Sequence, residues 1–290
     1  MKNFIITTDN TCDLDEKELK KLKLEIAHLP YFVNDEEFSE ETGKSLGYEE
    51  FFDKMKKGFY TRTSLINEYN AEMFLEKQLK KGVDVLHLGI SSGLSGTFAS
   101  FQKAADKLNK VYDNKVYVVD TKSTSSGLGI LIEMVANKAK NANTIKEIFD
   151  YAQTISGNIA HYFTVEDLKY LLRGGRISKA SAIIGTFINI KPIIYCDQNG
   201  SLVSLSKVLS RKKSLLKLVE KFKEKYNQQF NKVYISHAQC HEDAEFIAAE
   251  IKKISNVEVV IEKINFVVGS HCGPGCIAIF FTTDQRKDKV

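Results

Sequence analysis

Apolar and polar positions in residues 1–156 alternate between short apolar runs and longer amphipathic stretches. The short runs predict strands at Phe4–Thr8, Ile26–Val33, Val83–Ile90 and Val116–Asp120. Apolar residues three and four positions apart predict helices at Leu14–Leu22, Tyr48–Gly58, Ala71–Lys81, Thr97–Leu108, Leu128–Lys140 and Asn143–Ile155. Strands that alternate with helices of this length favour a parallel sheet, so we expect an N-terminal α/β/α sandwich over residues 1–156.

The pattern changes after Gly157, where hairpins mix with helices. Strands are predicted at Ile159–Val165, Lys191–Cys196, Leu202–Val208, Lys232–His237, Val257–Ile264, Phe266–Val268 and Cys276–Phe281. Helices are predicted at Glu166–Leu172, Ala180–Phe187, Lys213–Tyr226 and Glu242–Ile254. Asn199-Gly200 between two of the strands is a strong hairpin signal. We therefore expect an α+β second domain over residues 157–290.

Composition places the chain among ordinary globular proteins. It is 43% apolar and 27% charged, which excludes a disordered or fibrous protein. Its net charge of +4 over 290 residues is too weak to indicate nucleic acid binding. No apolar run approaches the roughly 18 residues of a membrane span, and no apolar stretch of signal-peptide length follows Met1. Five scattered cysteines are a poor disulfide framework, so we expect reduced thiols and a cytoplasmic protein.

Three polar loops lie at or beside the carboxyl ends of predicted strands, where ligands bind in open α/β sheets. They are Thr61–Ser64, Ser91–Thr97 (SSGLSGT) and Thr121–Ser126. The second loop combines glycines, hydroxyls and a following helix N-terminus, which together favour an anion. The alternative is that Ser95 or Thr97 only caps the helix.

Ser95 is also a candidate nucleophile, because it follows Gly93-Leu94 as in a hydrolase elbow. The elbow motif Gly-x-Ser-x-Gly needs a glycine where this chain has Thr97. The chain also lacks the phosphate-binding motif Gly-x4-Gly-Lys-[Ser/Thr].

Histidines and cysteines cluster at His237–His241 and at His271–Cys276. Cys272 and Cys276 have a loose zinc-ligand spacing, but burial as small apolar side chains is the alternative, and we expect no metal. His271 begins a Gly-Pro-Gly turn, where it is either a turn histidine or a donor into a site between the domains.

Basic residues form two further motifs. Arg173-Gly174-Gly175-Arg176 places two arginines on a turn, and Arg211 opens a helix with two lysines. Such groups usually form a solvated face, but arginine forks also bind phosphate in a bidentate way.

Seven motifs in the same order resemble the DegV family. They are Thr8–Leu14 (TDNTCDL), Thr63-Ser64, Ser91–Thr97, Val119–Lys122, Leu171–Ser178 (LLRGGRIS), Ile190–Pro192 and Ser270–Gly275 (SHCGPG). The resemblance covers essentially the whole chain and implies a DegV-like fold, also called the EDD fold. The chain departs from the family pattern at Leu65-Ile66, where Gln-Pro is usual, and at Cys272 and Cys276.

The resemblance implies a lipid-binding carrier that buries one long-chain fatty acid, such as palmitate or oleate, between its two domains. By motif, the carboxylate ligands fall on Thr63 and Ser95, with Ser92 as a secondary candidate. His271 matches a family histidine near the head group. No cofactor is implied beyond the bound lipid.

The resemblance also implies a partner. The chain would be the fatty acid-binding subunit of a bacterial fatty acid kinase, whose catalytic subunit phosphorylates the carboxylate to acyl phosphate. Arg173, Arg176 and Arg211 would then contact the phosphate or the kinase, and we expect them away from the apolar strands that would line the lipid cavity. A transient contact with a membrane surface is compatible with this role. The alternative remains a stand-alone lipid hydrolase or acyltransferase, with Ser95 as nucleophile and His271 as base.

Overall fold

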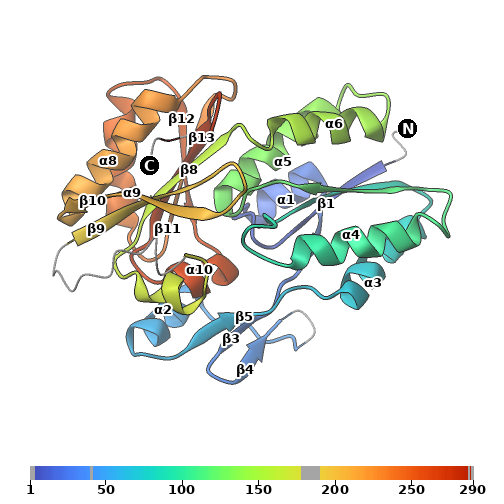
Figure 1. The fold of residues 1–290 in the computed structure, drawn as a ribbon, viewed down its shortest axis with the longest axis horizontal. Helices are drawn as coiled ribbons and strands as arrows, with labels where there is room; N and C mark the ends of the chain where they lie inside the picture. The colour runs from blue at the N-terminus through green and yellow to red at the C-terminus, as the bar shows by residue number, and fades with distance from the viewer. Residues whose placement is uncertain (1–3, 40–41, 178–189, 287, 289–290) are drawn as a thin grey trace.

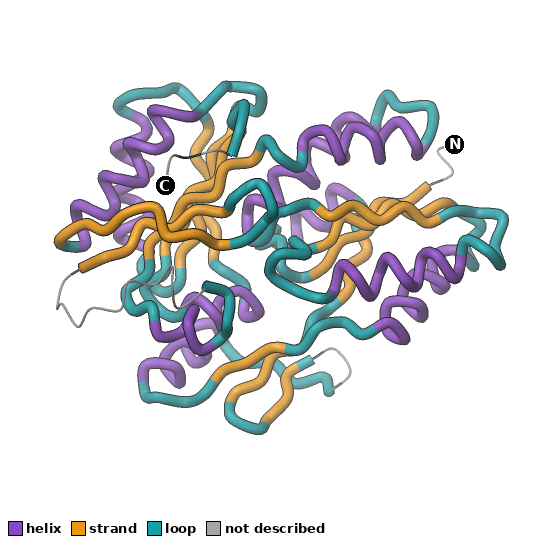
Figure 2. Tube along the Cα trace, in the orientation of Figure 1, coloured by secondary structure: helices purple, strands orange, loops and turns teal. Residues whose placement is uncertain are grey.

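The computed structural model describes residues 4–39, 42–177, 190–286 and 288, whose strands form three sheets (Figures 1 and 2). The strands are β1 (Phe4–Asp9), β2 (Glu25–Ala27), β3 (Tyr31–Val33), β4 (Glu36–Phe38), β5 (Thr61–Thr63), β6 (Asp84–Gly89), β7 (Val116–Asp120), β8 (Ile159–Thr164), β9 (Ile190–Cys196), β10 (Leu202–Leu209), β11 (Lys232–His237), β12 (Glu258–Lys263) and β13 (Ile277–Thr282). The helices are α1 (Glu16–Leu22), α2 (Tyr48–Lys56), α3 (Glu68–Leu79), α4 (Thr97–Leu108), α5 (Ser125–Ala139), α6 (Ile145–Ile155), α7 (Lys169–Arg173), α8 (Arg211–Lys225), α9 (His241–Lys252) and α10 (Phe266–Cys272). The helix predicted at Ala180–Phe187 lies outside the described residues.

The first sheet has four parallel strands in the order β2-β1-β6-β7. Helices α3 and α4 pack together on one face, and α5 and α6 lie on the other (Figure 1). Because helices cover both faces, β6 is buried along nearly its whole length. The predicted α/β/α sandwich is confirmed.

The second sheet has six strands in the order β10-β9-β8-β13-β11-β12. Only β11 and β12 are parallel neighbours, and the other pairs are antiparallel. The hairpin predicted at Asn199-Gly200 joins β9 to β10, and Gly200 has the positive φ of +77° that such a turn uses. Helices α8 and α9 pack on this sheet, so the predicted second domain with a mixed sheet is confirmed.

Helix α5 lies between the two large sheets and packs against both layers. It contacts α6 on one side and β8, β11 and β13 on the other. A helix buried on all sides is apolar all round, and its buried apolar residues are Leu128, Ile130, Leu131, Ile132, Met134 and Val135. The buried carboxylate of Glu133 accepts hydrogen bonds from the Lys232 ammonium at 2.8 Å and from the Tyr234 hydroxyl. These contacts hold α5 against the second sheet.

Two predicted strands are wrong, and each error has a local cause. The stretch Ile26–Val33 forms two strands in different sheets, β2 and β3, because Pro30 interrupts it and lacks an N–H for pairing. Phe266–Val268 is the first turn of α10, where the Asn265 side chain accepts a backbone N–H as a helix cap. The predicted polar loop Thr61–Ser64 contains β5, which pairs with β3.

Helix α10 returns from the C-terminal part of the chain to the third sheet. It packs on β5, β3 and α2, which all come from residues 31–63. The two large sheets are nevertheless separated in sequence by the connection between α6 and β8. A division at residues 156 and 157 stays a prediction.

The buried side chain of His87 in β6 makes the free energy of unfolding depend on pH. Its fully buried ring stacks on Phe101, and burial lowers the pKa of His87 from 6.5 to about 3. Below pH 6.5 the unfolded chain binds a proton that the folded chain does not, so stability falls with acidification. We expect wild type to lose roughly 2 kcal/mol of stability relative to His87→Phe between pH 7 and pH 5. Urea unfolding at both pH values measures it, and a difference independent of pH contradicts this account.

Candidate functional site

A narrow cavity lies where the first sheet's loops face the second sheet and α10. The space free of protein atoms is about 810 Å³, which includes the part open to solvent. Only about 90 Å³ of this space is wide enough for the centre of a water molecule. Its apolar wall comes from both halves of the chain: Leu29, Ile90, Leu94, Phe163, Leu171, Leu202, Ile264, Val267, Val268, Ala278 and Phe280. Its polar lining residues are Thr63, Ser95, Thr124, Ser125, His161, Arg176 and His271, and three cysteines, Cys196, Cys272 and Cys276, complete the lining.

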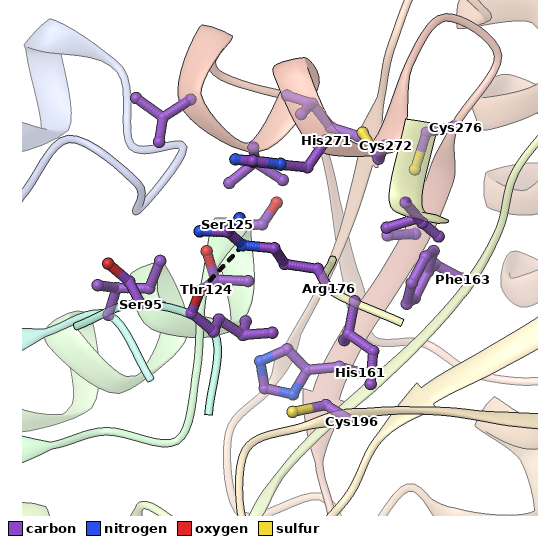
Figure 3. A pocket seen from close by; sticks show the side chains of 18 of the residues that line it. Ser95, Thr124, Ser125, His161, Phe163, Arg176, Cys196, His271, Cys272 and Cys276 are labelled. Atoms are coloured by element: carbon purple, nitrogen blue, oxygen red, sulfur yellow. Dashed lines mark hydrogen bonds between the residues drawn. The ribbon is translucent and has the colours of Figure 1, made fainter. Parts of the chain in front are cut away.

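All three polar loops predicted from the sequence reach this cavity. Thr63 ends β5, Ser95 lies in the loop after β6, and Thr124 and Ser125 follow β7. Strands β6 and β7 are parallel neighbours, so the loops at their carboxyl ends meet at one edge of the sheet. Figure 3 shows Ser95, Thr124 and Ser125 on one side of the pocket and His271 on α10 across from them.

Thr63 and His271 form one polar pair in the wall. The Thr63 hydroxyl lies 2.7 Å from Nε2 of His271, although the two residues are 208 positions apart in the chain. Burial, together with the Arg176 and Arg173 guanidinium groups, lowers the pKa of His271 to about 3. The imidazole is therefore neutral near pH 7 and offers hydrogen bonds without a full charge.

Ser95 lines the cavity and also supports the start of α4. Its hydroxyl accepts the Thr97 N–H at 3.2 Å and donates to the Thr97 hydroxyl at 3.0 Å. The capping alternative therefore describes part of what Ser95 does. Among the described residues, no hydrogen bond joins Ser95 to His271, so the nucleophile alternative lacks an aligned base.

Ser92 points away from the cavity and is absent from its wall. Its backbone N–H donates to the Asp120 carboxylate at 3.0 Å, and its hydroxyl accepts from the Lys122 ammonium at 3.3 Å. The structure therefore brings Thr63, Ser95 and His271 to one cavity but does not bring Ser92 there.

The two arginines of the Arg173–Arg176 motif lie in different surroundings. Arg176 lines the cavity and donates through Nε to the Leu94 carbonyl at 3.2 Å, whereas the sequence predicts it away from the apolar wall. Figure 3 shows its side chain extending toward Thr124 and Ser125. Arg173 is exposed, with its guanidinium 4.5 Å from the Tyr60 ring centre. Of these two arginines, Arg176 is the one that lines the cavity.

Arg211 is engaged by neighbouring residues on α9 and before β13. Its guanidinium pairs with the Asp243 carboxylate at 2.7 Å and donates to the Gly275 carbonyl at 2.8 Å. These bonds tie the start of α8 to α9 and to the turn before β13. Its remaining nitrogen, Nη1, has no hydrogen-bond partner but is buried, so another molecule does not reach it in this arrangement.

The cysteines and histidines do not gather into a metal site. Among the described residues, no group of three or more potential ligands has the geometry to hold a metal ion. Cys240 is half-buried, and burial raises the pKa of its thiol to about 12. Cys272 and Cys276 are buried, as expected of small apolar side chains in a core.

Sequence reasoning missed part of this cavity wall. Thr124 and Ser125 belong to a loop that the sequence singles out, but the helix predicted from Leu128 begins at Ser125. His161 and Phe163 lie inside β8 and carry no signal that distinguishes them from core residues. Their place in the cavity wall follows only from the packing of β8 against α5.

Comparison with known proteins agrees with this architecture. The model of the DegV family, described as uncharacterised, matches residues 3–284. A DegV domain-containing protein of Clostridium perfringens is 34% identical over 290 residues, covering 99% of this chain and 100% of that protein.

Solved structures of DegV family proteins have the same fold as this chain. DegV of Bacillus subtilis, described as a fatty acid binding protein, has a TM-score of 0.83 and 27% identity, covering 98% of this chain and 100% of that one. A fatty acid binding DegV family protein of Streptococcus agalactiae has a TM-score of 0.86 and 25% identity, covering 98% of this chain and 100% of that one. The family model and the curated relative both extend over almost the whole sequence, and the chain therefore belongs to the DegV family.

Proposed function

We propose that this protein binds one long-chain fatty acid, such as palmitate or oleate, in the cavity between the two large sheets. The single observation that carries the proposal is a narrow apolar cavity with hydroxyl groups from separate loops in its wall. In this proposal the carboxylate lies between Thr63 and Ser95, and His271 holds the Thr63 hydroxyl in place. The relatives described as fatty acid binding support the same ligand class.

The chemistry of the wall suits a carboxylate attached to a long chain. Burial of the chain contributes about 0.8 kcal/mol per methylene, so the apolar wall supplies most of the affinity. Neutral hydroxyls donate to the carboxylate without a tight buried ion pair, which would carry a large desolvation penalty. Arg176 adds a positive charge to the same wall while it donates to the Leu94 carbonyl.

We further propose that the protein presents this carboxylate to a partner kinase, which transfers phosphate from ATP to form acyl phosphate. Under this proposal the protein is a carrier and makes no bond itself. A partner that uses ATP would place this function in the cytoplasm. Among the described residues no helix has the length and apolarity to cross a membrane.

Arg173 is the best-placed side chain for the kinase or the phosphate. It is exposed and donates to the Thr61 hydroxyl at 3.3 Å, two residues from Thr63. Arg176 is proposed to contact the phosphate from inside the wall. Arg211 stays a weaker candidate because its guanidinium is held by Asp243 and Gly275 and its unpaired Nη1 is buried.

Binding and phosphorylation should separate in the Arg173→Ala variant. We expect oleate affinity close to that of wild type, because the apolar wall supplies most of it. Acyl phosphate production with a cognate kinase and ATP should fall several-fold at low kinase concentration and recover as kinase approaches saturation. Calorimetry with oleate and a turnover assay on the same preparation measure both quantities.

Arg62→Ala is the matched control, because Arg62 is also exposed and stacks on an aromatic ring, that of Phe32, at 3.7 Å. Its side chain leaves β5 on the face opposite Thr61 and Thr63. An equal loss of turnover in both variants would assign the effect to general charge. A parallel loss of oleate affinity and turnover in Arg173→Ala would place Arg173 in the lipid site.

A further inference from the structure

Two buried polar atoms in the cavity wall have no hydrogen-bond partner. They are Nε2 of His161 on β8 and the hydroxyl oxygen of Thr124, just before α5. The His161 side chain is only 4% exposed. Buried polar groups in proteins are nearly always paired, so two orphans in the wall of one cavity indicate a ligand group that pairs with them. The proposed carboxylate ligands, Thr63 and Ser95, do not account for these two atoms.

The other ring nitrogen of His161, Nδ1, decides whether Nε2 donates or accepts a hydrogen bond. Nδ1 of His161 lies 2.9 Å from the Ile159 carbonyl oxygen, which can only accept, so Nδ1 carries the hydrogen. Burial and the positive charge of Arg286 lower the pKa of His161 well below its ordinary value, so the ring is neutral. In the neutral ring, Nε2 is a lone-pair acceptor that needs a donor.

Both orphan atoms lie at the first turn of α5. A Cβ on Gly127 would lie 2.7 Å and 2.8 Å from two carbons of the His161 ring and nearer still to Nε2. Thr124 precedes Gly127 by three residues, and residues with that spacing share one face of a helix. The Thr124 hydroxyl makes no cap bond to α5 and remains free to donate or accept. Both residues line the cavity.

The surroundings of this polar spot are apolar. The Phe280 ring lies edge-on to His161 with 5.2 Å between ring centres, and Phe163 and Ala278 complete the nearby wall. A plain hydrocarbon chain at this point leaves both polar atoms buried and unpaired, which costs binding energy.

We propose that the cavity accepts a fatty acid whose chain carries a hydroxyl group, which donates to Nε2 of His161 and accepts from the Thr124 hydroxyl. This inference rests on the proposed function and names the ligand class more narrowly. A hydroxyl fits because it both donates and accepts. A keto group or a second carboxylate only accepts, and either would face the lone pair of Nε2.

The test compares stearate with its monohydroxy and monoketo derivatives, substituted along the middle of the chain, by calorimetry on delipidated protein. We expect one hydroxy isomer to bind roughly tenfold more tightly than stearate, as one additional buried hydrogen bond provides. The keto compound of the same position should show no such gain. If every hydroxy isomer binds more weakly than stearate, or the keto compound binds equally well, the proposal is overturned while the proposed function stands. If stearate itself does not bind, the proposed function fails.

A variant identifies the atom responsible. His161→Phe keeps an aromatic ring and removes the acceptor, so the preference for the hydroxy isomer should disappear. Stearate should bind this variant at least as tightly as wild type, because the wall no longer buries that unpaired acceptor. His87→Phe is the matched control, because His87 is also buried with an unpaired Nε2 but lies outside the wall of this cavity. Thr124→Val gives a second measurement if His161→Phe does not fold, and it should reduce the preference. A preference that persists in both variants contradicts the proposal.

Discussion

Replacing Thr63 with valine and Ser95 with alanine together is expected to weaken oleate binding roughly hundredfold or more. Each hydroxyl is proposed to donate to the carboxylate, and a hydrogen bond to a charged group contributes about 1.5–3 kcal/mol. Both substitutions keep the apolar wall, so residual binding through the acyl chain should remain. Calorimetry with oleate on the delipidated double variant measures the loss.

Two measurements control this result. Ser92→Ala removes a hydroxyl from the same loop, but Ser92 faces Lys122 rather than the cavity, so oleate affinity should not change. Urea unfolding should show that the double variant stays folded, since it loses only the contacts of Thr63 with His271 and of Ser95 with Thr97. Unchanged affinity in the double variant, or an equal loss in Ser92→Ala, would contradict the assignment of the carboxylate ligands.

Gly273→Ala is expected to lower the free energy of unfolding by about 3 kcal/mol or more, from strain and overpacking together. Gly273 ends α10 with φ of +75°, a conformation that alanine rarely adopts. A Cβ there would also lie 2.6 Å from two atoms of the buried Tyr170 ring. Because α10 carries His271, we also expect oleate affinity to fall. Urea unfolding at pH 7 measures the stability, and calorimetry measures the affinity.

Substitutions at two other glycines separate the contributions of backbone strain and overpacking to this loss of stability. Gly175 has φ of +69° but no atom within 4 Å of a built Cβ, so Gly175→Ala should show the cost of strain alone, about 1 kcal/mol or slightly more. Gly157 has neither a positive φ nor a close neighbour, and Gly157→Ala should change stability by less than about 0.5 kcal/mol. If Gly273→Ala costs no more than Gly175→Ala, packing against Tyr170 is not what holds the end of α10.

The regular elements were predictable because their apolar spacing reflects burial. The strands at Val116–Asp120 and Lys232–His237 and the helix at Thr97–Leu108 have the predicted bounds. The hairpin at Asn199-Gly200 follows from turn chemistry that is local in sequence. Where the apolar pattern was ambiguous, as at Phe266–Val268, a short apolar run did not distinguish strand from helix, and the cap residue Asn265 decided it.

The candidate site was predictable only in part. The loops after β6 and β7 follow from strand order, because the carboxyl ends of parallel strands meet at one edge. Thr63 instead ends β5 of the antiparallel third sheet, and its place in the wall does not follow from that rule. The pairing of Thr63 with His271 spans 208 positions and depends on α10 returning to β5, which no local pattern shows. The place of Arg176 in the wall and the unpaired, buried Nε2 of His161 likewise depend on packing between distant elements.

The most direct test of the central claim is a crystal structure of the delipidated protein with oleate added. We expect continuous electron density for one acyl chain between the two large sheets. Its carboxylate should lie within hydrogen-bond distance, about 2.5–3.0 Å, of the hydroxyls of Thr63 and Ser95. An empty cavity with lipid bound elsewhere, or a chain whose carboxylate lies far from both hydroxyls, would contradict the account.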